Sequence, residues 1–187
     1  PPKDVRPETI GLPFVGEVKV VNENGETVKR GEIGEILVRG PHIMKGYWKR
    51  PEINKIVFTE DGWLRTGDAG YIDEDGYIHF VERIKDLIVA SGYKIAPSEV
   101  EDVLMRHPAV KEAGVIGVPD PYRGQTVKAF ISLKDEYKGK ITEQEIIEWC
   151  KEKMAAYKYP RIVEFIDEIP KHTMTRKVLR QKLRELE

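Results

Sequence analysis

The sequence predicts an α+β protein, with a small β-barrel-like subdomain followed by a compact α+β C-terminal domain. Residues 13–81 carry β-branched runs separated by Asn-Gly and Asp-Gly pairs, which are typical of β-hairpins. From about Lys85 onward, short strand patterns alternate with helical patterns. The length of 187 residues suits two small domains, since one domain takes roughly 100 to 200 residues. We therefore expect one domain at residues 1–84 and another at residues 85–187.

The first domain is expected to consist mainly of strands. Its β-branched runs lie at residues 15–21, 33–38 and 77–81. Glycine accepts a positive φ without strain, so a glycine after Asn or Asp favours a tight turn. Such pairs occur at Asn24-Gly25, Asp61-Gly62 and Asp75-Gly76.

The second domain is expected to mix strands and helices. Strand patterns lie at residues 86–90, 110–118, 127–133 and 161–166. Helical patterns lie at residues 100–106, 146–156 and 177–187. The first two helices follow possible capping boxes, Ser98-x-x-Glu101 and Thr142-x-x-Glu145, in which side chains bind the unpaired amides of the first turn.

Composition and charge exclude several classes of function. The 31 Lys and Arg residues nearly balance the 32 Asp and Glu residues, so the net charge of -1 favours neither nucleic acid nor an anionic membrane as a partner. No apolar run approaches the ~18 residues of a membrane span. The four histidines lack ligand spacing, so we expect no metal site, and the single Cys150 favours a buried structural thiol in a cytoplasmic protein.

Two turn segments have unusual chemistry, and the residues alone leave two interpretations of each open. In Thr66-Gly67-Asp68 the carboxylate can accept two hydrogen bonds from a ribose diol, or it can cap its own turn. Gly92 can be an ordinary turn glycine, or it can allow an extended ligand to approach the backbone.

The C-terminal tail is the third unusual segment. It has no acidic residue between Glu168 and Glu185. Hydroxyl residues before Lys177 at the head of a helix suit a loop that delivers an ammonium group to a phosphate. A basic, solvated helix end is the alternative interpretation.

Taken in order, these segments resemble the adenylate-forming superfamily of acyl-CoA synthetases, firefly luciferase and peptide-synthetase adenylation domains, over essentially the whole chain. The resemblance rests on five motifs in register. They are GEILVRG at residues 34–40, KGYWKRP at 45–51, the run from WLRTGD to PSEVE at 63–101, HPAVKEAGVIGVPDPYRGQ at 107–125, and the lysine motif at 170–180.

The resemblance implies a nucleotide site in the first domain. Asp68 is similar to the family's aspartate that binds the ribose hydroxyls of ATP, and Thr66 shapes the loop of that aspartate. Arg83 resembles an arginine that contacts the ribose or the phosphates. Phe80 stands where an apolar residue packs near the adenine.

The resemblance also implies two working states of the second domain. Lys85 is at the position of a hinge about which that domain rotates between the two half-reactions. Lys177 resembles the lysine that bridges the carboxylate substrate and the ATP phosphate during adenylation. The loop that lines the tunnel for the pantetheine arm of coenzyme A corresponds to Ser91, Gly92, Tyr93 and Lys94.

The sequence departs from the family pattern near the catalytic lysine. Arg176 replaces the usual glycine, and the segment from Pro170 to Lys177 is one residue longer than is common, which makes Lys171 a rival donor. Glu82 stands in place of the glycine before the nucleotide-site arginine. Val89 is apolar where some members have a residue used in the second half-reaction.

The family's phosphate loop and adenine motif are not in this sequence. The resemblance therefore implies a C-terminal fragment of an ATP-dependent acyl-CoA synthetase, inactive without the N-terminal portion. Its expected substrates are ATP, a fatty or other carboxylic acid, and coenzyme A, with AMP released. Mg²⁺ is expected to accompany ATP, without ligands identifiable here. The alternatives are an aryl-CoA ligase or other adenylating enzyme, and a non-catalytic nucleotide- or CoA-binding module.

Overall fold

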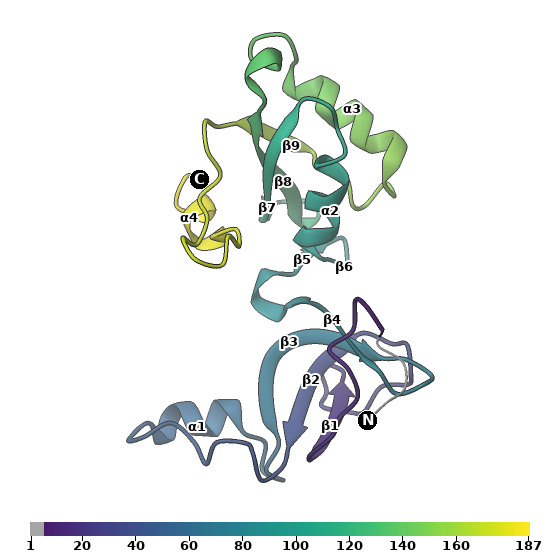
Figure 1. Cartoon of the computed structure of the whole chain (residues 1–187), viewed down its shortest axis with the longest axis vertical. Coiled ribbons are helices and arrows are strands. Elements are labelled where there is room, and N and C mark those ends of the chain that lie inside the picture. Colours follow the sequence, from purple (N-terminus) through teal and green to yellow (C-terminus); the bar gives the residue numbers. More distant parts are fainter. Residues whose placement is uncertain (1–5) are drawn as a thin grey trace. The chain divides into compact units, whose positions relative to one another are not determined.

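The computed structural model describes residues 6–187, and these divide into two compact units, unit 1 up to Lys85 and unit 2 from Asp86 to Glu187 (Figure 1). Each unit has its own sheet. Helices occur together with mainly antiparallel strands, which confirms the α+β class. No helix among residues 6–187 combines the length and the apolar character needed to cross a bilayer.

Unit 1 is built on a four-stranded antiparallel sheet in the order β1-β2-β3-β4. Its strands are β1 (Glu17–Val21), β2 (Gly34–Arg39), β3 (Leu64–Ile72) and β4 (Ile78–Arg83). β1 and β4 form the two edges, so the sheet is open. The barrel-like description is corrected on this point, because four strands give too small a circumference to enclose side chains.

The core of unit 1 lies on both faces of its sheet. Successive side chains of a strand point to opposite faces, so neighbouring residues of one strand enter different clusters. One buried cluster contains Val20, Ile36 and Ile78, and the other contains Val21, Leu37 and Trp63.

Two elements of unit 1 were not predicted. β3 carries Gly67 and Gly70, which weaken a strand pattern, yet Gly70 is required there. A Cβ at Gly70 would lie 2.2 Å from the backbone oxygen of His79 on β4. Helix α1 (Pro51–Val57) follows β2, and none of its residues is buried.

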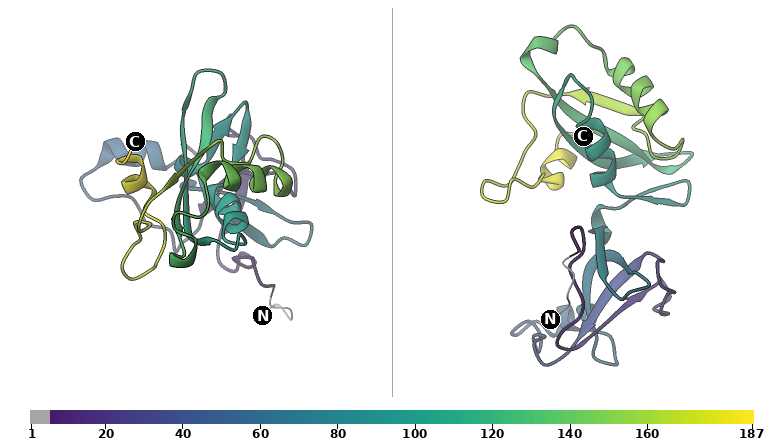
Figure 2. Two further views of the ribbon diagram at one scale, coloured as in Figure 1. Left: turned by 90° about the horizontal axis from the view of Figure 1, so that it is seen from above. Right: turned by 45° about the vertical axis from the view of Figure 1, so that its right-hand side comes forward.

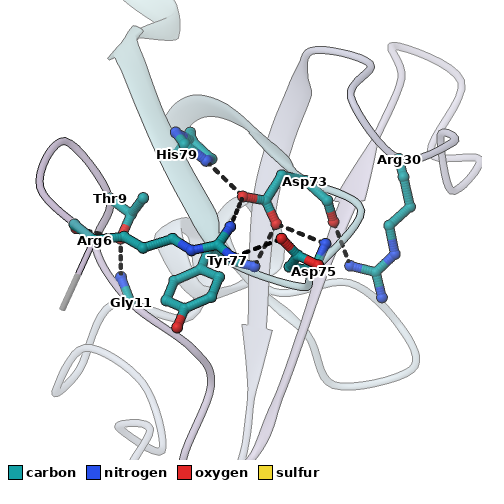
Figure 3. A network of polar contacts seen from close by, with 8 residues as sticks. All are labelled: Arg6, Thr9, Gly11, Arg30, Asp73, Asp75, Tyr77 and His79. Carbon is teal, nitrogen blue, oxygen red and sulfur yellow. Dashed lines mark hydrogen bonds and ion pairs between the residues drawn. The ribbon is translucent and has the colours of Figure 1, made fainter. Parts of the chain in front are cut away.

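A polar network holds the turn between β3 and β4 (Figure 3). The Asp73 carboxylate accepts the backbone N–H groups of Asp75 at 3.0 Å and Tyr77 at 2.8 Å, and it lies 3.0 Å from His79 Nε2. Arg6 contacts Asp75 at 2.7 Å and Asp73 at 3.5 Å. Hydrogen bonding with His79, then with the Tyr77 amide, and the charge of Arg6 lower the pKa of Asp73. The charged carboxylate thus ties the N-terminal segment to the turn.

Unit 2 is built on a five-stranded sheet in the order β6-β5-β8-β7, with β9 parallel to β8. Its strands are β5 (Ile88–Ala90), β6 (Tyr93–Ile95), β7 (Val110–Asp120), β8 (Gly124–Leu133) and β9 (Ile162–Phe165). Its helices are α2 (Pro97–Leu104), α3 (Glu143–Lys153) and α4 (Arg180–Arg184), and a 3-10 turn, η2 (Asp135–Tyr137), follows β8. A second 3-10 turn, η1 (Ile84–Asp86), spans the division between the two units.

Helices cover both faces of this sheet (Figure 2). α2 and α3 place Val100 and Ile146 in the larger buried cluster, together with Ala129 of β8. The next residue of β8, Phe130, points to the other face and packs with Leu183 of α4. The sheet is therefore covered on both faces, which explains why residues 126–133 of β8 are all buried although Thr126, Lys128 and Ser132 among them are polar.

The two predicted capping boxes have different outcomes. The box at α3 is confirmed, because the Glu145 amide donates to Thr142 Oγ1 at 3.3 Å and the Thr142 amide donates to Glu145 Oε2 at 2.7 Å. The box at α2 is wrong, because this helix begins at Pro97, whose missing N–H needs no cap. Glu101 instead points inward and accepts the Val115 amide at 2.9 Å.

The last helix is shorter than the predicted residues 177–187. Lys171 and Val178 form an antiparallel bridge, and the His172 amide donates to the Lys177 carbonyl at 2.8 Å. This pairing holds Lys177 in a loop outside the helix, so α4 begins only at Arg180.

Candidate active site

Asp68 is positioned by its own turn and by the neighbouring strand. Thr66 Oγ1 donates to the Ile36 carbonyl of β2 at 2.7 Å and accepts the Asp68 amide at 3.1 Å. Gly67 between them has a φ of 71°, a conformation that glycine adopts without strain. The threonine and the glycine therefore fix the backbone at Asp68, whose side chain stays 30% exposed.

Arg83 lies directly opposite Asp68 on β4. Its Nε lies 3.4 Å from Asp68 Oδ1, and the two side chains are 62% and 30% exposed, respectively. Solvent screens such a pair, so it adds little stability. A carboxylate has about four lone-pair positions, which leaves acceptors on Asp68 for a second partner beside the arginine.

Phe80 and Glu82 precede Arg83 on β4. Phe80 is half-exposed and stands opposite Gly70, where only a glycine fits. Glu82 is buried, and its Oε1 accepts the Arg83 amide at 3.1 Å. Residues 66 and 68 on β3 and residues 80 and 83 on β4 therefore lie on two adjacent strands of unit 1, and their common role in a nucleotide site stays a prediction.

In unit 2, the segment from Ser91 to Lys94 forms the tip of the β5–β6 hairpin. Ser91 and Gly92 have φ values of 51° and 83°, the positive pair that two-residue hairpins favour. The Ser91 amide donates to the Arg123 carbonyl at 2.9 Å, which ties the tip to the β7–β8 turn. Lys94 is exposed on β6.

Tyr93 stacks on Tyr157, with ring centroids 4.2 Å apart and planes inclined by 14°. Tyr157 comes from the loop after α3 and was not identified from the sequence. A shallow cleft of about 230 Å³ lies beside this stack. It is lined by Glu99, Val103, Lys153, Met154, Ala155, Tyr157 and Lys158. Contacts between distant segments create this cleft, so no local sequence signal marks it.

The two candidate catalytic lysines have different surroundings. Lys171 Nζ lies 2.7 Å from Glu112 Oε1, and both side chains are about one-fifth exposed. Lys177 is exposed, and its backbone carbonyl accepts the hydrogen bond from the His172 amide that closes the loop between residues 172 and 177. Arg176, immediately before it, has a φ of 58°, the conformation that glycine adopts most easily. The loop thus keeps a glycine-type backbone although the side chain has changed.

Lys85 lies in η1, and the division between the two units falls directly after it. Asp86, the next residue, accepts a hydrogen bond from the Arg184 guanidinium at 2.9 Å. Within residues 6–187, no group of three or more His, Cys, Asp or Glu side chains is arranged to hold a metal ion.

Comparison with known families adds independent information. The family described as AMP-binding enzyme matches residues 1–48, and the family described as AMP-binding enzyme C-terminal domain matches residues 99–177. A long-chain-fatty-acid–CoA ligase of Bacillus subtilis is 46% identical over 185 residues, which covers 97% of this chain and 32% of the relative. Feruloyl-CoA synthase of Amycolatopsis is 43% identical over 175 residues, covering 93% of this chain and 35% of the relative.

Solved structures agree with the sequence matches. ATP-bound MatB from Rhodopseudomonas palustris is 38% identical and aligns with a TM-score of 0.86, covering 98% of this chain and 36% of that chain. The chain spans about a third of the length of the curated relatives it matches. The two family matches, the sequence relatives and the solved structure all point to the same family. The chain therefore belongs to the AMP-binding, adenylate-forming enzyme family.

Proposed function

We propose that this chain is the C-terminal portion of an ATP-dependent acyl-CoA synthetase. The reaction joins a fatty or similar carboxylic acid to coenzyme A through an acyl-adenylate, releasing pyrophosphate and then AMP. The observation that carries the proposal is the partly exposed Asp68 carboxylate in a chain related to fatty-acid–CoA ligases. Thr66 Oγ1 accepts the backbone amide of Asp68, and Arg83 is paired with its carboxylate.

In this proposal, unit 1 is the last subdomain of the adenylating domain and binds the nucleotide. The free lone pairs of Asp68 accept hydrogen bonds from the two ribose hydroxyls. Arg83 supplies a positive charge next to the same position, and the half-exposed Phe80 ring packs near the adenine. Mg²⁺ would accompany the ATP phosphates and would supply positive charge there, and we assign it no ligand among the residues of this chain.

Lys177 is the proposed catalytic residue of the first half-reaction. Negative charge builds on the phosphate oxygens when the carboxylate attacks the α-phosphate, and a fixed ammonium group lowers that barrier. Lys171 is less suited to this role, because Glu112 neutralises its charge at 2.7 Å. Lys177 is exposed on a loop whose backbone is closed by His172, so its ammonium group can reach a ligand.

The second half-reaction requires a thiol at the place that the lysine occupied. We propose that unit 2 rotates about Lys85, which withdraws Lys177 and brings the hairpin tip from Ser91 to Lys94 toward the acyl-adenylate. Such a motion gates the two reactions without adding a catalytic group. The hairpin tip suits this role, because Gly92 leaves open space: a Cβ there would meet nothing within 4 Å.

The remaining portion of the parent enzyme is the proposed partner of unit 1. Phe14, Trp48 and Ile56 are exposed to 95%, 86% and 71%, and helix α1 buries none of its residues. Covering these side chains with the remaining portion would remove their apolar area from water. We expect the chain alone to be inactive, and we propose a cytoplasmic enzyme in which buried Cys150 stays reduced.

The test is ATP–pyrophosphate exchange with residues 1–187, alone and in the full-length parent enzyme. Exchange is expected only in the full-length protein. There, Lys177→Ala is expected to lower the rate by about 10²-fold or more, as the loss of one charge-stabilising donor does. Lys182→Ala, an exposed lysine on α4, is the matched control and is expected to leave the rate unchanged. Robust exchange by the isolated chain would contradict the proposal.

A second acyl class is favoured by one observation. The feruloyl-CoA synthase is nearly as similar to this chain as the fatty-acid ligase, so an aryl acid is the alternative substrate. Comparing exchange with a long-chain fatty acid and with a hydroxycinnamic acid separates the two.

A non-catalytic binding module is the remaining alternative. It requires that the isolated chain bind ATP or coenzyme A, with binding lost in Asp68→Ala or Gly92→Leu. Isothermal titration of the isolated chain measures this directly, and the absence of binding removes the alternative.

A further inference from the structure

Helix α4 is fixed on the sheet of unit 2 by a buried residue. Leu183 is fully buried and packs against Phe130 and Ile169. Gly114 of β7 lies beneath it, and a Cβ on that residue would be only 2.7 Å from Leu183 Cδ1. The glycine therefore allows the helix to approach the strand closely. A helix of only 5 residues is too short to be stable by itself, and this contact supplies its support.

Two arginines, one helical turn apart, extend from α4 toward the body of unit 2. Residues four apart lie on the same face of a helix. The first, Arg180, has its Nη2 3.0 and 2.9 Å from the two carboxylate oxygens of Glu101 on α2. The second, Arg184, donates from Nη2 to Asp86 Oδ1 at 2.9 Å. α4 is thereby tied to α2 and to the first residue of unit 2.

Asp86 occupies a special place in the chain. It ends η1 and is the first residue of unit 2, two residues before β5 begins at Ile88. Its side chain is only 13% exposed. The contact with Arg184 spans 98 residues of sequence, so it joins the start of unit 2 to the end of the chain.

We propose that Arg184 is a positioning residue that confines the hinge to Lys85 by anchoring Asp86 to unit 2. This inference rests on the proposed function, in which unit 2 rotates about Lys85. Without the anchor, the backbone torsions of Asp86 and Leu87 also change when unit 2 rotates. Rotation is then shared among more residues, and the two working orientations become less sharply defined.

The same anchor serves the catalytic loop. α4 begins three residues after Lys177, and Arg184 is the last residue of that helix. The helix that follows the catalytic loop is therefore joined, through one guanidinium group, to the residue that follows the hinge. Loop and hinge boundary then belong to one rigid body, so rotation at Lys85 displaces Lys177 by a fixed amount.

The first test measures backbone order parameters by ¹⁵N relaxation in residues 1–187. In the wild type, Asp86 and Leu87 are expected near 0.85, the value of rigid backbone, and in Arg184→Gln they are expected to fall below about 0.6. Val115 in β7 is the internal reference and keeps its value. Arg106→Gln, an exposed arginine beyond the end of α2, is the matched control and changes neither site.

Charge exchange distinguishes a specific anchor from a general loss of structure. Asp86→Arg combined with Arg184→Asp is expected to restore the order that each single change removes, because the ion pair is rebuilt with reversed polarity. Unchanged order parameters in Arg184→Gln would overturn the proposal. Equal disorder in the single and exchanged variants would overturn it as well, and that comparison holds even if Arg184→Gln loosens α4.

The second test separates this inference from the proposed function. In the full-length enzyme, Arg184→Gln is expected to slow overall acyl-CoA formation by a larger factor than pyrophosphate exchange, because only the overall reaction requires the rotation. If the order parameters fall and both rates stay equal to wild type, the anchoring of Asp86 stands and the hinge at Lys85 is refuted. If pyrophosphate exchange is absent even in the wild-type enzyme, the proposed function itself fails.

Discussion

Replacing Gly70 by alanine tests whether the β3–β4 register, which places Phe80 and the Asp68–Arg83 pair, depends on close packing of the backbone. A Cβ at this position would lie 2.2 Å from the His79 carbonyl oxygen and 2.6 Å from Ile36 Cδ1. The Ile36 side chain can rotate away, whereas the carbonyl belongs to the paired strand. The two strands must therefore move apart where the register shift between Ala69 and Gly70 already interrupts the ladder.

The expected magnitude follows from two opposing effects. Overpacking a rigid site costs about 1–3 kcal/mol, and a contact with backbone belongs near the upper end of that range. Alanine restricts the unfolded chain more than glycine does and returns about 0.4–1 kcal/mol. We expect Gly70→Ala to lower the free energy of unfolding by about 2 kcal/mol.

Urea unfolding followed by tryptophan fluorescence measures this change, because Trp63 is buried in unit 1. Ile36→Val in the Gly70→Ala background is the control. It removes the 2.6 Å contact and leaves the 2.2 Å contact, so it is expected to recover only a small part of the lost stability. A neutral or stabilising Gly70→Ala, or full recovery by Ile36→Val, would refute the reasoning.

Three further outcomes are expected. The pKa of Asp73 is lowered in the folded state, so its contribution to stability is present at pH values above its unfolded-state pKa of about 3.9 and is lost as the pH falls through the folded-state pKa. Asp73→Asn should therefore weaken the fall in unfolding free energy at acidic pH. An unchanged pH dependence would contradict the network. Arg176→Gly should raise the melting temperature slightly, since the positive φ of Arg176 costs a non-glycine residue about 1 kcal/mol. A lower melting temperature would instead show that the arginine side chain stabilises the loop. Burial raises the pKa of Cys150 to about 12, so iodoacetamide at pH 8 should label it only after unfolding, and rapid labelling of the native chain would disprove its burial.

Local patterns predicted most of the regular structure because they depend on nearest neighbours. The strands at residues 15–21, 33–38 and 77–81 appear within about two residues of their predicted bounds, and so does the Thr142–Glu145 capping box. The capping box at Ser98 failed for a tertiary reason. Pro97 already begins the helix, and the Glu101 carboxylate is more strongly held by the Val115 amide and Arg180.

The sequence by itself determined the α+β class, the order of the family motifs, and the residue types that a nucleotide site and a catalytic lysine require. These properties depend only on residue types and their separations along the chain, and both are read directly from the linear sequence. Only the tertiary structure decided which lysine is held by Glu112, that Lys177 precedes α4 in a bridged loop, and that Tyr157 stacks on Tyr93. The contact of Arg184 with Asp86 was decided in the same way. Each of these contacts joins residues that become neighbours only when the sheet and its covering helices pack together, so no local pattern could have revealed them.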